Sequence, residues 1–382
     1  MKGNLVIFNS NYPSPANLYG DVFVHSRVRH YMQHFNVQIL GCRPDLAQPE
    51  EYVYEGVNVL NLNSKHAFID YIQNNPPDII GIHFVAGWMV DSILAHVKVP
   101  VFIWIHGYEA LGWYRRLFNF KLSESVSFGK YILSNTRQML RMNKLSQISN
   151  KQKNIRFIFV SNWMKTIMET DTRSKIEQYY LIPNPIDSEQ FAYHPKASEL
   201  RKKILLIRSF DSKKYANDIA IEAILHLSKK DFFKELDFTI YGKGKYFKPL
   251  TDRLVQFNNV KIVNEFVENK NIPSVHREYG VFLCPTRQDA QGVSMCEAMS
   301  SGLVPVTSNN TAIPEFITDG QNGLLSNSAQ EMATCIEKLY RHPELFTAIS
   351  VKAAKSIRAM AGHQVVINKE ISLLSEALRG TN

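Results

Sequence analysis

The chain has few cysteines and no long apolar run. Its four cysteines, Cys42, Cys284, Cys296 and Cys335, include no Cys-x-x-Cys pair, which favours free thiols in a reducing compartment over a disulfide framework. No stretch reaches the roughly 18 apolar residues that a membrane-spanning helix needs. The N-terminal apolar run, Leu5–Phe8, is shorter than the core of a signal peptide. We therefore expect a soluble, cytoplasmic protein.

Glycine, proline and charged residues are too few for a fibrous or disordered chain. There are 18 glycines and 16 prolines among 382 residues, and 21% of the residues are charged. Hydrophobic residues make up 45%, and the length suits two domains whose cores need no disulfide or structural metal. Lysine and arginine exceed aspartate and glutamate by 44 to 35, so we expect an anionic partner.

Short β-rich segments alternate with longer helical patterns along most of the chain. The strands are nearly continuous apolar runs, as in strands that a parallel sheet buries on both faces. The alternation occurs twice, and the proline-containing segment 181–187 between the halves suits a linker. The pattern predicts two doubly wound α/β domains. The predicted strands are 5–8, 37–40, 78–84, 99–105 and 157–160, then 203–207, 238–241, 260–263, 281–284 and 304–306.

A glycine-containing turn in the second half has the features of a phosphate site. It follows the predicted strand that ends at Cys284, and a helix is predicted to begin at the turn. The backbone N–H groups of Gly292, Val293 and Ser294 are then unpaired donors at a helix N-terminus, where a phosphate binds well.

Two carboxylates flank this turn eight residues apart. Asp289 precedes the turn, and Glu297 lies about one turn inside the predicted helix. A sugar diphosphate at the turn then has its sugar near Asp289 and its ribose near Glu297. On spacing alone, an ordinary glycine-started helix with an N-terminal Asp and one buried Glu also explains the pattern.

The segment 285–306 resembles the E-x7-E signature of retaining glycosyltransferases of glycosyltransferase family 4. Here the signature is D-x7-E, with Asp289 in place of the first Glu and Gln291 in place of the usual Phe. Further motifs of that family occur in the expected order and cover about residues 155–330. They are Phe159-Val160-Ser161, Ile182-Pro183-Asn184-Pro185-Ile186-Asp187, Leu205-Leu206-Ile207-Arg208 with lysines 213 and 214, Ile240-Tyr241-Gly242-Lys243-Gly244, and Pro314-Glu315 with Asp319-Gly320 and Asn322-Gly323.

The resemblance implies the GT-B fold, in which two Rossmann-like domains face a central cleft. An acceptor-binding domain is expected at 1–185, a nucleotide-sugar domain at 186–360, and a C-terminal helix at 361–382 that packs back on the first domain. The implied function is that of a retaining hexosyltransferase of bacterial cell-envelope polysaccharide synthesis. Its donor is a UDP-sugar rather than GDP-mannose, and its acceptor is a glycan or a lipid-linked glycan.

Two other functions remain open on the same fold. One is a non-catalytic subunit that binds a sugar nucleotide or a glycan, which the shorter carboxylate of Asp289 favours. The other is a sugar-nucleotide epimerase. Transfer or hydrolysis of the donor distinguishes an enzyme from the first alternative, and the identity of the product distinguishes a transferase from the second.

A departing nucleoside diphosphate gathers negative charge that an enzyme must stabilise. No two aspartates stand two residues apart, so the chain lacks the Asp-x-Asp pair with which many transferases hold a metal ion. We therefore expect no metal cofactor, and we assign the positive charge to Arg208 and Lys214. Lys213 is the alternative to Lys214, and a solvated pair of surface lysines is the simplest other explanation.

The resemblance also implies where the rest of the donor lies. The base is expected against Gly242, Phe266 and Val267. In the first half, Gly20 follows a Pro-containing loop and is expected to let the donor approach the backbone. His106 ends a predicted strand at the sheet edge where α/β folds bind ligands. The resemblance gives His106 a contact with the reacting sugar, and a structural histidine is the alternative.

Positive charge is concentrated in one segment. Residues 115–156 contain ten Lys or Arg and one acidic residue, Glu124, a net +9 that equals the excess of the whole chain. Aromatic residues such as Trp113, Tyr114 and Phe118 lie beside or within it. We predict that the segment docks on an anionic membrane surface, at the inner face of the cytoplasmic membrane, with about 1 kcal/mol per basic residue. A solvated helical face is the alternative, and no motif suggests nucleic acid as a partner.

Overall fold

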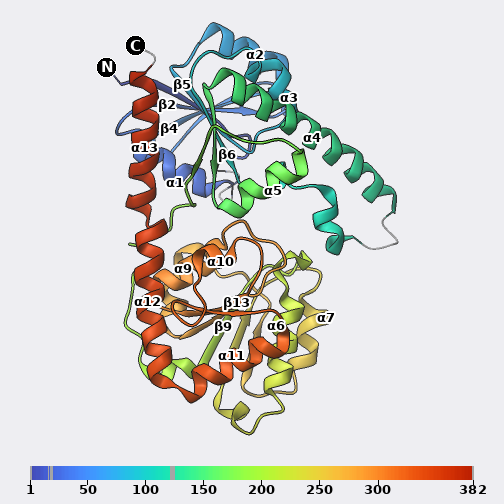
Figure 1. Cartoon of the computed structure of the whole chain (residues 1–382), viewed down its shortest axis with the longest axis vertical. Coiled ribbons are helices and arrows are strands. Elements are labelled where there is room, and N and C mark those ends of the chain that lie inside the picture. Colours follow the sequence, from blue (N-terminus) through green and yellow to red (C-terminus); the bar gives the residue numbers. More distant parts are fainter. Residues whose placement is uncertain (1, 16, 18–19, 121–124, 381–382) are drawn as a thin grey trace. The chain divides into compact units, whose positions relative to one another are not determined.

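The computed structural model describes residues 2–15, 17, 20–120 and 125–380 (Figure 1). By its internal contacts the chain divides into two compact units. Unit 1 consists of Met1–Arg115, Leu122–Ile182 and Ile367–Asn382, and unit 2 of Arg116–Lys121 and Pro183–Val366. The sequence predicted domain boundaries after residues 185 and 360, and the structure divides after Ile182 and after Val366.

Unit 1 is built on a sheet with the strand order β3-β4-β2-β1-β5-β6-β7-β8, and helices cover both of its faces (Figure 1). Every pair of neighbours is parallel except the β3–β4 hairpin. The central strands β5 and β6 are buried at every residue, which explains their unbroken apolar sequences. The strands are β1 (Asn4–Phe8), β2 (Asn36–Cys42), β3 (Glu50–Tyr54), β4 (Val57–Leu62), β5 (Ile79–His83), β6 (Val101–Ile105), β7 (Ile155–Phe159) and β8 (Tyr179–Leu181), and the helices are α1 (Val22–Tyr31), α2 (Lys65–Asn74), α3 (Gly87–Met89), α4 (Ser125–Gln152), α5 (Asn162–Thr172) and α13 (His363–Arg379).

The hairpin of β3 and β4 is absent from the sequence-based prediction. The two residues of its turn, Glu55 and Gly56, have φ values of 45° and 82°, as a two-residue hairpin turn with two left-handed positions requires. Strand β3 lies at the edge of the sheet and is largely exposed. It therefore lacks the apolar run by which the buried strands were predicted.

Helix α13 anchors itself in unit 1 through one buried carboxylate. The side chain of Glu370 pairs with Arg27 at 3.2 Å, and it accepts hydrogen bonds from the Tyr31 hydroxyl at 2.6 Å and the Trp104 indole at 3.0 Å. All four side chains are buried. The C-terminal helix thus completes the core of the N-terminal unit, as the fold prediction requires.

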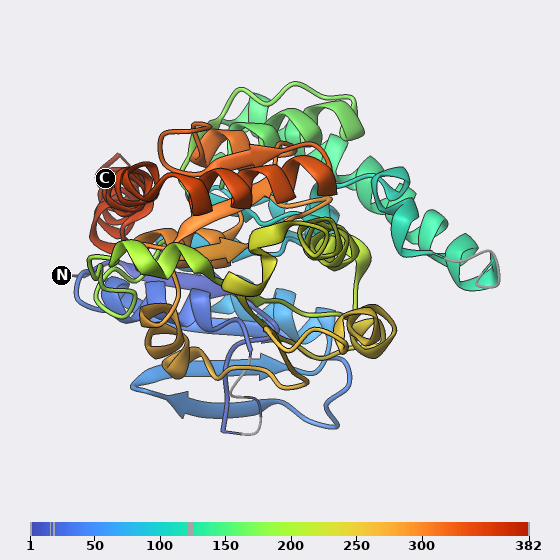
Figure 2. The same cartoon turned by 90° about the horizontal axis from the view of Figure 1, so that it is seen from below.

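Unit 2 is built on a sheet with the order β11-β10-β9-β12-β13-β14, in which all neighbours are parallel. Helices α6 and α11 pack together over one face of this sheet and share its apolar core (Figure 2). The order of strands reverses between β9 and β12, and ligands of such sheets bind beside the carboxyl ends of the strands at this point. The strands are β9 (Lys203–Ile207), β10 (Asp237–Tyr241), β11 (Val260–Val263), β12 (Val281–Leu283), β13 (Val304–Ser308) and β14 (Leu324–Ser326), and the helices are α6 (Asn217–Leu227), α7 (Phe247–Thr251), α8 (Ile272–Arg277), α9 (Val293–Ser300), α10 (Ile313–Phe316), α11 (Ala329–Arg341) and α12 (Pro343–Ala361).

Two doubly wound, parallel α/β units confirm the predicted fold class. The second unit has the strand order of a Rossmann fold. Short 3-10 turns connect several of its elements, and one of them, η6 (Lys213–Tyr215), follows β9 and contains both candidate lysines.

Candidate functional site

The loop after β9 brings two cations to one aromatic ring. Arg208 directly follows β9 and is 8% exposed. Its guanidinium carbon lies 5.4 Å from the centre of the Tyr215 ring, and the Lys214 ammonium lies 5.2 Å from the same centre. Lys213 instead lies 6.0 Å from the ring centre of Tyr246. Tyr215 therefore groups Arg208 with Lys214 and not with Lys213.

Arg208 has few hydrogen-bond partners for a buried cation. One terminal nitrogen lies 3.5 Å from the carbonyl oxygen of Cys284, at the outer limit of a hydrogen bond. Its Nε is buried without a partner in the described part of the chain. No described Asp or Glu forms a salt bridge with Arg208 or Lys214. A buried guanidinium with unpaired N–H groups is costly, so this place suits an anion that supplies acceptor oxygens.

The neighbouring strand end holds the Lys214 backbone in place. The backbone N–H of Arg287 donates to the carbonyl of Lys214 at 2.8 Å, and its guanidinium donates to the carbonyl of Lys213 at 2.8 Å. The same guanidinium binds both oxygens of Asp218, at 2.8 and 2.6 Å. The loops after β9 and β12 are therefore tied together at the point where the strand order reverses. No sequence motif indicated Arg287.

Asp289 holds the turn that leads into α9. Its Oδ1 accepts hydrogen bonds from the backbone N–H groups of Gly292 at 2.7 Å and Gln291 at 3.2 Å. The prediction that the Gly292 N–H is unpaired is therefore wrong, because a carboxylate three residues earlier already satisfies it. Among the described residues, the N–H groups of Val293 and Ser294 keep no protein acceptor, and the Ser294 hydroxyl is buried without a partner. The predicted start of the helix at this turn is confirmed.

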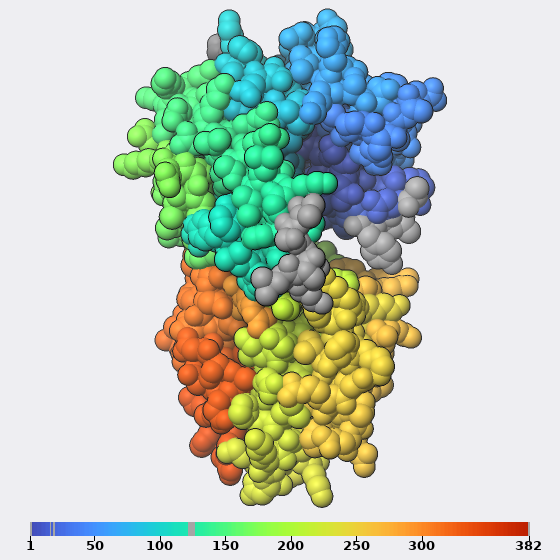
Figure 3. Space-filling view, turned by 90° about the vertical axis from the view of Figure 1, so that its right-hand side faces the viewer, coloured from blue at the N-terminus to red at the C-terminus, as the bar shows by residue number. Residues whose placement is uncertain are grey.

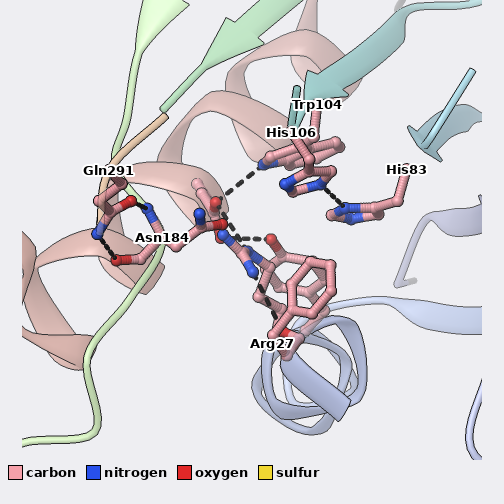
Figure 4. A network of polar contacts seen from close by, with 9 residues as sticks. Arg27, His83, Trp104, His106, Asn184 and Gln291 are labelled. Atoms are coloured by element: carbon pink, nitrogen blue, oxygen red, sulfur yellow. Dashed lines mark hydrogen bonds and ion pairs between the residues drawn. The ribbon is translucent and has the colours of Figure 1, made fainter. Parts of the chain in front are cut away.

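Gln291 ties this turn to the segment 182–187. Its side-chain oxygen accepts from the backbone N–H of Asn184 at 2.6 Å, and its side-chain nitrogen donates to the Asn184 carbonyl at 3.0 Å (Figure 4). Gln291 is buried. Both bonds require an amide, so the departure from the usual Phe has a structural role. The sequence showed the departure but not the partner.

Glu297 lies in α9 and is only partly exposed. Burial raises the pKa of its carboxyl to about 8, and the positive charge of Arg208 opposes the rise. The two side chains are therefore close enough to interact, which links α9 to the cations of the β9 loop. A ligand hydroxyl or a cation at this carboxyl favours its charged form.

We expect Glu297→Gln to change the pH dependence of stability. Because the folded pKa of about 8 exceeds the ordinary glutamate pKa of 4.5, the folded protein binds one more proton than the unfolded chain between these pH values. The free energy of unfolding of the parent therefore falls as pH rises through this window. The variant cannot ionise there, so its Tm should exceed the parent's at pH 8.5 and approach it at pH 5. Glu278→Gln, at an exposed position of the same unit, is the control. An unchanged pH profile in Glu297→Gln contradicts the shift.

The residues predicted to hold the base lie at the carboxyl ends of β10 and β11. Gly242 follows β10, and a Cβ there would overlap the Arg208 carbonyl and the Phe210 ring. Only glycine lets β10 approach the Arg208 loop this closely. Phe266 is exposed in the loop after β11 and Val267 is partly exposed. An exposed aromatic ring at this edge is available for stacking with a base.

In unit 1, His106 pairs with a second histidine that sequence reasoning missed. His83 is the last residue of β5, and His106 directly follows β6. The Nδ1 of His83 and the Nε2 of His106 are 2.9 Å apart, and the ring planes differ by 15° (Figure 4). The buried carboxylate of Glu109 accepts from the backbone N–H groups of His106 at 2.5 Å and Gly107 at 3.0 Å. The signal for His83 was present, since it ends an apolar strand just as His106 does.

A cavity of about 390 Å³ lies at the reversal point between β1 and β5 of unit 1. Its polar lining includes Asn9, Asn11, Asp21 and His83, and its aromatic lining includes Trp88. Asn9 donates to Asp21 at 2.8 Å and Asn11 donates to the other oxygen at 3.3 Å. Burial raises the pKa of the Asp21 carboxyl, and these two hydrogen bonds oppose the rise. Carboxylate, amide and aromatic groups together suit a polyhydroxylated ligand.

Gly20 precedes Asp21 and packs closely against the loop before it. A Cβ at Gly20 would stand 2.6 Å from the Asn11 carbonyl oxygen and 2.9 Å from the Pro13 nitrogen. The absence of a side chain therefore accommodates the loop's own backbone. That Gly20 also lets the donor approach the backbone stays a prediction.

The described residues also bear on metal binding, on membrane spans and on the state of the cysteines. In that part of the chain, no three His, Cys, Asp or Glu side chains are grouped to hold a metal ion. None of the described helices is long and apolar enough to cross a membrane. The four cysteines are free thiols.

Comparison with solved structures identifies the architecture. A sucrose-phosphate synthase from Thermosynechococcus elongatus is similar over 99% of this chain and 100% of its own, with a TM-score of 0.74 and 12% identity. The Anabaena protein HepE, in complex with UDP and glucose, is similar over 98% and 100%, with a TM-score of 0.68 and 12% identity. The chain has the GT-B fold.

Sequence comparison points to the same group of proteins. Residues 201–342 of this GT-B chain, which include α9 and the loops after β9 and β12, match the model of the family described as glycosyl transferases group 1. The alpha-monoglucosyldiacylglycerol synthase of Acholeplasma laidlawii is 24% identical over 200 residues, 48% of this chain and 49% of that protein. The chain spans half or less of the length of the first curated relatives it matches. These matches support the group 1 glycosyltransferase family.

Proposed function

We propose that the chain is a retaining glycosyltransferase that uses a nucleotide-diphospho-sugar without a metal ion. The observation that carries this proposal is Arg208, buried beside Lys214 with an unpaired Nε and no salt bridge to an acidic side chain among the described residues. A diphosphate supplies acceptor oxygens for both cations and for the N–H groups of Val293 and Ser294. A UDP-sugar is the proposed donor, supported by the crystal structure of the similarly folded HepE with UDP and glucose.

In the proposed reaction, an acceptor hydroxyl attacks the anomeric carbon on the face that the diphosphate leaves. The new C–O bond forms as the C–O bond to phosphate breaks, and the departing phosphate oxygen takes the proton of the acceptor hydroxyl. Arg208 and Lys214 stabilise the charge on the diphosphate. We propose that Asp289 binds the hydroxyls of the sugar through its Oδ2, since the hydrogen bonds of this carboxylate to the turn use Oδ1. Glu297 is proposed to bind the ribose and Phe266 to stack on the base. His106 is proposed to contact the sugar.

Calorimetry with UDP, GDP, ADP and their sugars, followed by assays of hydrolysis and transfer, tests the function. We expect UDP and a UDP-sugar to bind and the bound sugar to be released or transferred with retention. Turnover should persist in EDTA, since the proposed charge stabilisation uses side chains. Binding without turnover favours the non-catalytic subunit, and a UDP-sugar of altered configuration favours the epimerase. Loss of turnover in EDTA contradicts the metal-free proposal.

The acceptor is proposed to be a lipid-linked or envelope glycan at an anionic membrane, and helix α4 supports this. Basic residues and leucines recur on α4 at successive spacings of three, four and eleven residues, so they share one face. Leu133 and Leu140 on that face are 54% and 68% exposed. Both views in Figures 1 and 2 show the N-terminal half of α4 extending beyond the sheet of its unit, and Figure 3 shows its blue-green residues at the surface. The face consists of Lys130, Leu133, Arg137, Leu140 and Lys151.

The structure reduces the positive charge expected of the segment 115–156. Arg115 pairs with the buried carboxylate of Asp171 at 2.7 Å. Lys144 and Arg141 pair with Asp91 at 2.6 and 3.7 Å. Interaction partners outside the segment therefore neutralise part of its charge. Residues 121–124, which include Lys121 and Glu124, lie outside the described residues.

We expect Lys130→Glu/Arg137→Glu to abolish most vesicle binding. The parent should sediment with vesicles that contain anionic lipid, less so as salt rises, because each cation near the surface contributes about 1 kcal/mol. Lys352→Glu/Lys355→Glu on α12 makes the same change of charge at exposed positions of unit 2 and should leave binding unchanged. Equal binding to neutral and anionic vesicles, or equal loss of binding in both variants, contradicts membrane docking and indicates that the α4 face is an ordinary solvated surface.

A further inference from the structure

His83 and His106 of unit 1 form a hydrogen-bonded pair, and the surroundings of the two rings indicate which ring nitrogen of His106 is protonated. The Nδ1 of His83 and the Nε2 of His106 form one hydrogen bond of 2.9 Å. Burial holds the pKa of both imidazoles well below the usual range. The neighbouring His106 and then Arg27 lower the pKa of His83 further, and Arg27 lowers that of His106. Both rings are therefore neutral, and the shared bond contains a single proton. Either His83 or His106 is its donor.

The surroundings of His83 decide between the two arrangements. His83 is 2% exposed, and its Nε2 is buried with no partner in the described part of the chain. The Trp104 ring stacks on it, with centroids 4.6 Å apart and planes 15° apart. If His106 is the donor, His83 carries its own proton on Nε2 as an orphaned buried N–H. If His83 is the donor, only a lone pair is left unpaired there. Orphaned buried N–H groups are the rarer case.

We infer that His83 donates through Nδ1 and thereby fixes His106 in the tautomer that is protonated at Nδ1. No described residue is a partner for His106 Nδ1, this atom is not among the buried unpaired ones, and His106 is partly exposed, so its N–H is left for water or a ligand. His106 then offers a neutral donor to an oxygen of the transferred sugar, an assignment that rests on the proposed function. His83 is the positioning residue for this donor.

Other contacts keep both rings in this arrangement. The Trp104 indole that stacks on His83 is held by its 3.0 Å bond to Glu370 (Figure 4). The edge of the Phe23 ring packs against His106 at a centroid distance of 5.0 Å. The carboxylate of Glu109 holds the His106 backbone. The pair is therefore preorganised by helix α13, helix α1 and the loop after β6.

NMR of the ligand-free protein labelled with 15N-histidine tests the tautomer directly. Long-range proton–nitrogen correlations distinguish protonated from bare ring nitrogens, and His106→Phe assigns the signals of His106. We expect a protonated Nδ1 and a bare Nε2 in His106. A proton on Nε2 overturns the inference. Because this measurement needs no sugar nucleotide, it stands or fails independently of the proposed transfer activity.

Substitutions at His83 test the consequence for turnover. His83→Asn places an amide N–H where the Nδ1–H of histidine stands, so kcat should stay within a few-fold of the parent. His83→Leu keeps an apolar side chain without a donor, and kcat should fall roughly tenfold or more while UDP affinity is kept. An Asn variant as impaired as the Leu variant, with both folded by circular dichroism, overturns the positioning role. A parent without any transfer activity refutes the proposed function instead.

Discussion

Arg208→Ala and Lys214→Ala are each expected to lower turnover about 10²-fold or more, the scale of losing one preorganised charge-stabilising donor. We expect the larger loss for Arg208→Ala, because the Arg208 guanidinium is buried and its Nε has no partner among the described residues. The measurement is kcat and KM for a UDP-sugar, with UDP affinity by calorimetry. Turnover should fall more than affinity if the charge is used as the diphosphate departs.

Lys213→Ala is the matched control for this pair. The residue is adjacent and equally charged, but its ammonium lies over Tyr246 and not over Tyr215. We expect its turnover to stay within a few-fold of the parent. A greater loss in Lys213→Ala than in Lys214→Ala contradicts the assignment of the donor-loop lysine. Parent-like turnover in Arg208→Ala contradicts the diphosphate site itself.

Glu370→Ala is expected to destabilise unit 1 by about 3–5 kcal/mol, because it leaves the buried Arg27 without its counter-ion. The same change removes the acceptor for the Tyr31 hydroxyl and the Trp104 indole. The four tryptophans of the chain, Trp88, Trp104, Trp113 and Trp163, all belong to unit 1. Urea unfolding followed by tryptophan fluorescence therefore reports on this unit alone.

Glu376→Ala on the same helix provides the control. This glutamate lies six residues further along α13 and is exposed, so its removal should change the free energy of unfolding by no more than about 0.5 kcal/mol. A similar small effect for Glu370→Ala contradicts the importance of the buried ion pair. A double change, Arg27→Met with Glu370→Leu, should recover much of the loss, since it removes both buried charges together.

Local sequence was sufficient for the fold class and for the position of the turn that begins α9. The buried strands are apolar at nearly every residue, and a parallel sheet with helices on both faces is the architecture that such strands form. The turn before α9 was readable because Gly292, with φ at +78°, and the residues around it lie within one short segment. The edge strand β3 escaped prediction because it is exposed and carries no such apolar run, and in its partner β4 asparagines interrupt the run.

Arrangements that join distant parts of the chain required the tertiary structure. The choice of Lys214 over Lys213 depends on how Tyr215 and Tyr246 are placed. The bond between Gln291 and Asn184 joins residues 107 positions apart, and the contact of Glu370 with Arg27 spans 343 positions. The pairing of His83 with His106 arises because β5 and β6 are neighbours in the sheet.

The amino-acid sequence alone determined the alternation of elements, the ends of the buried strands and the types of residue available there, because each depends on neighbours along the chain. Tertiary structure alone decided which donors are free. Asp289 caps the Gly292 N–H, Asp171 neutralises Arg115, and Arg208 is left short of partners. The physical reason is that a polar group is committed or available according to what the fold packs against it, and strand order brings those partners from distant segments.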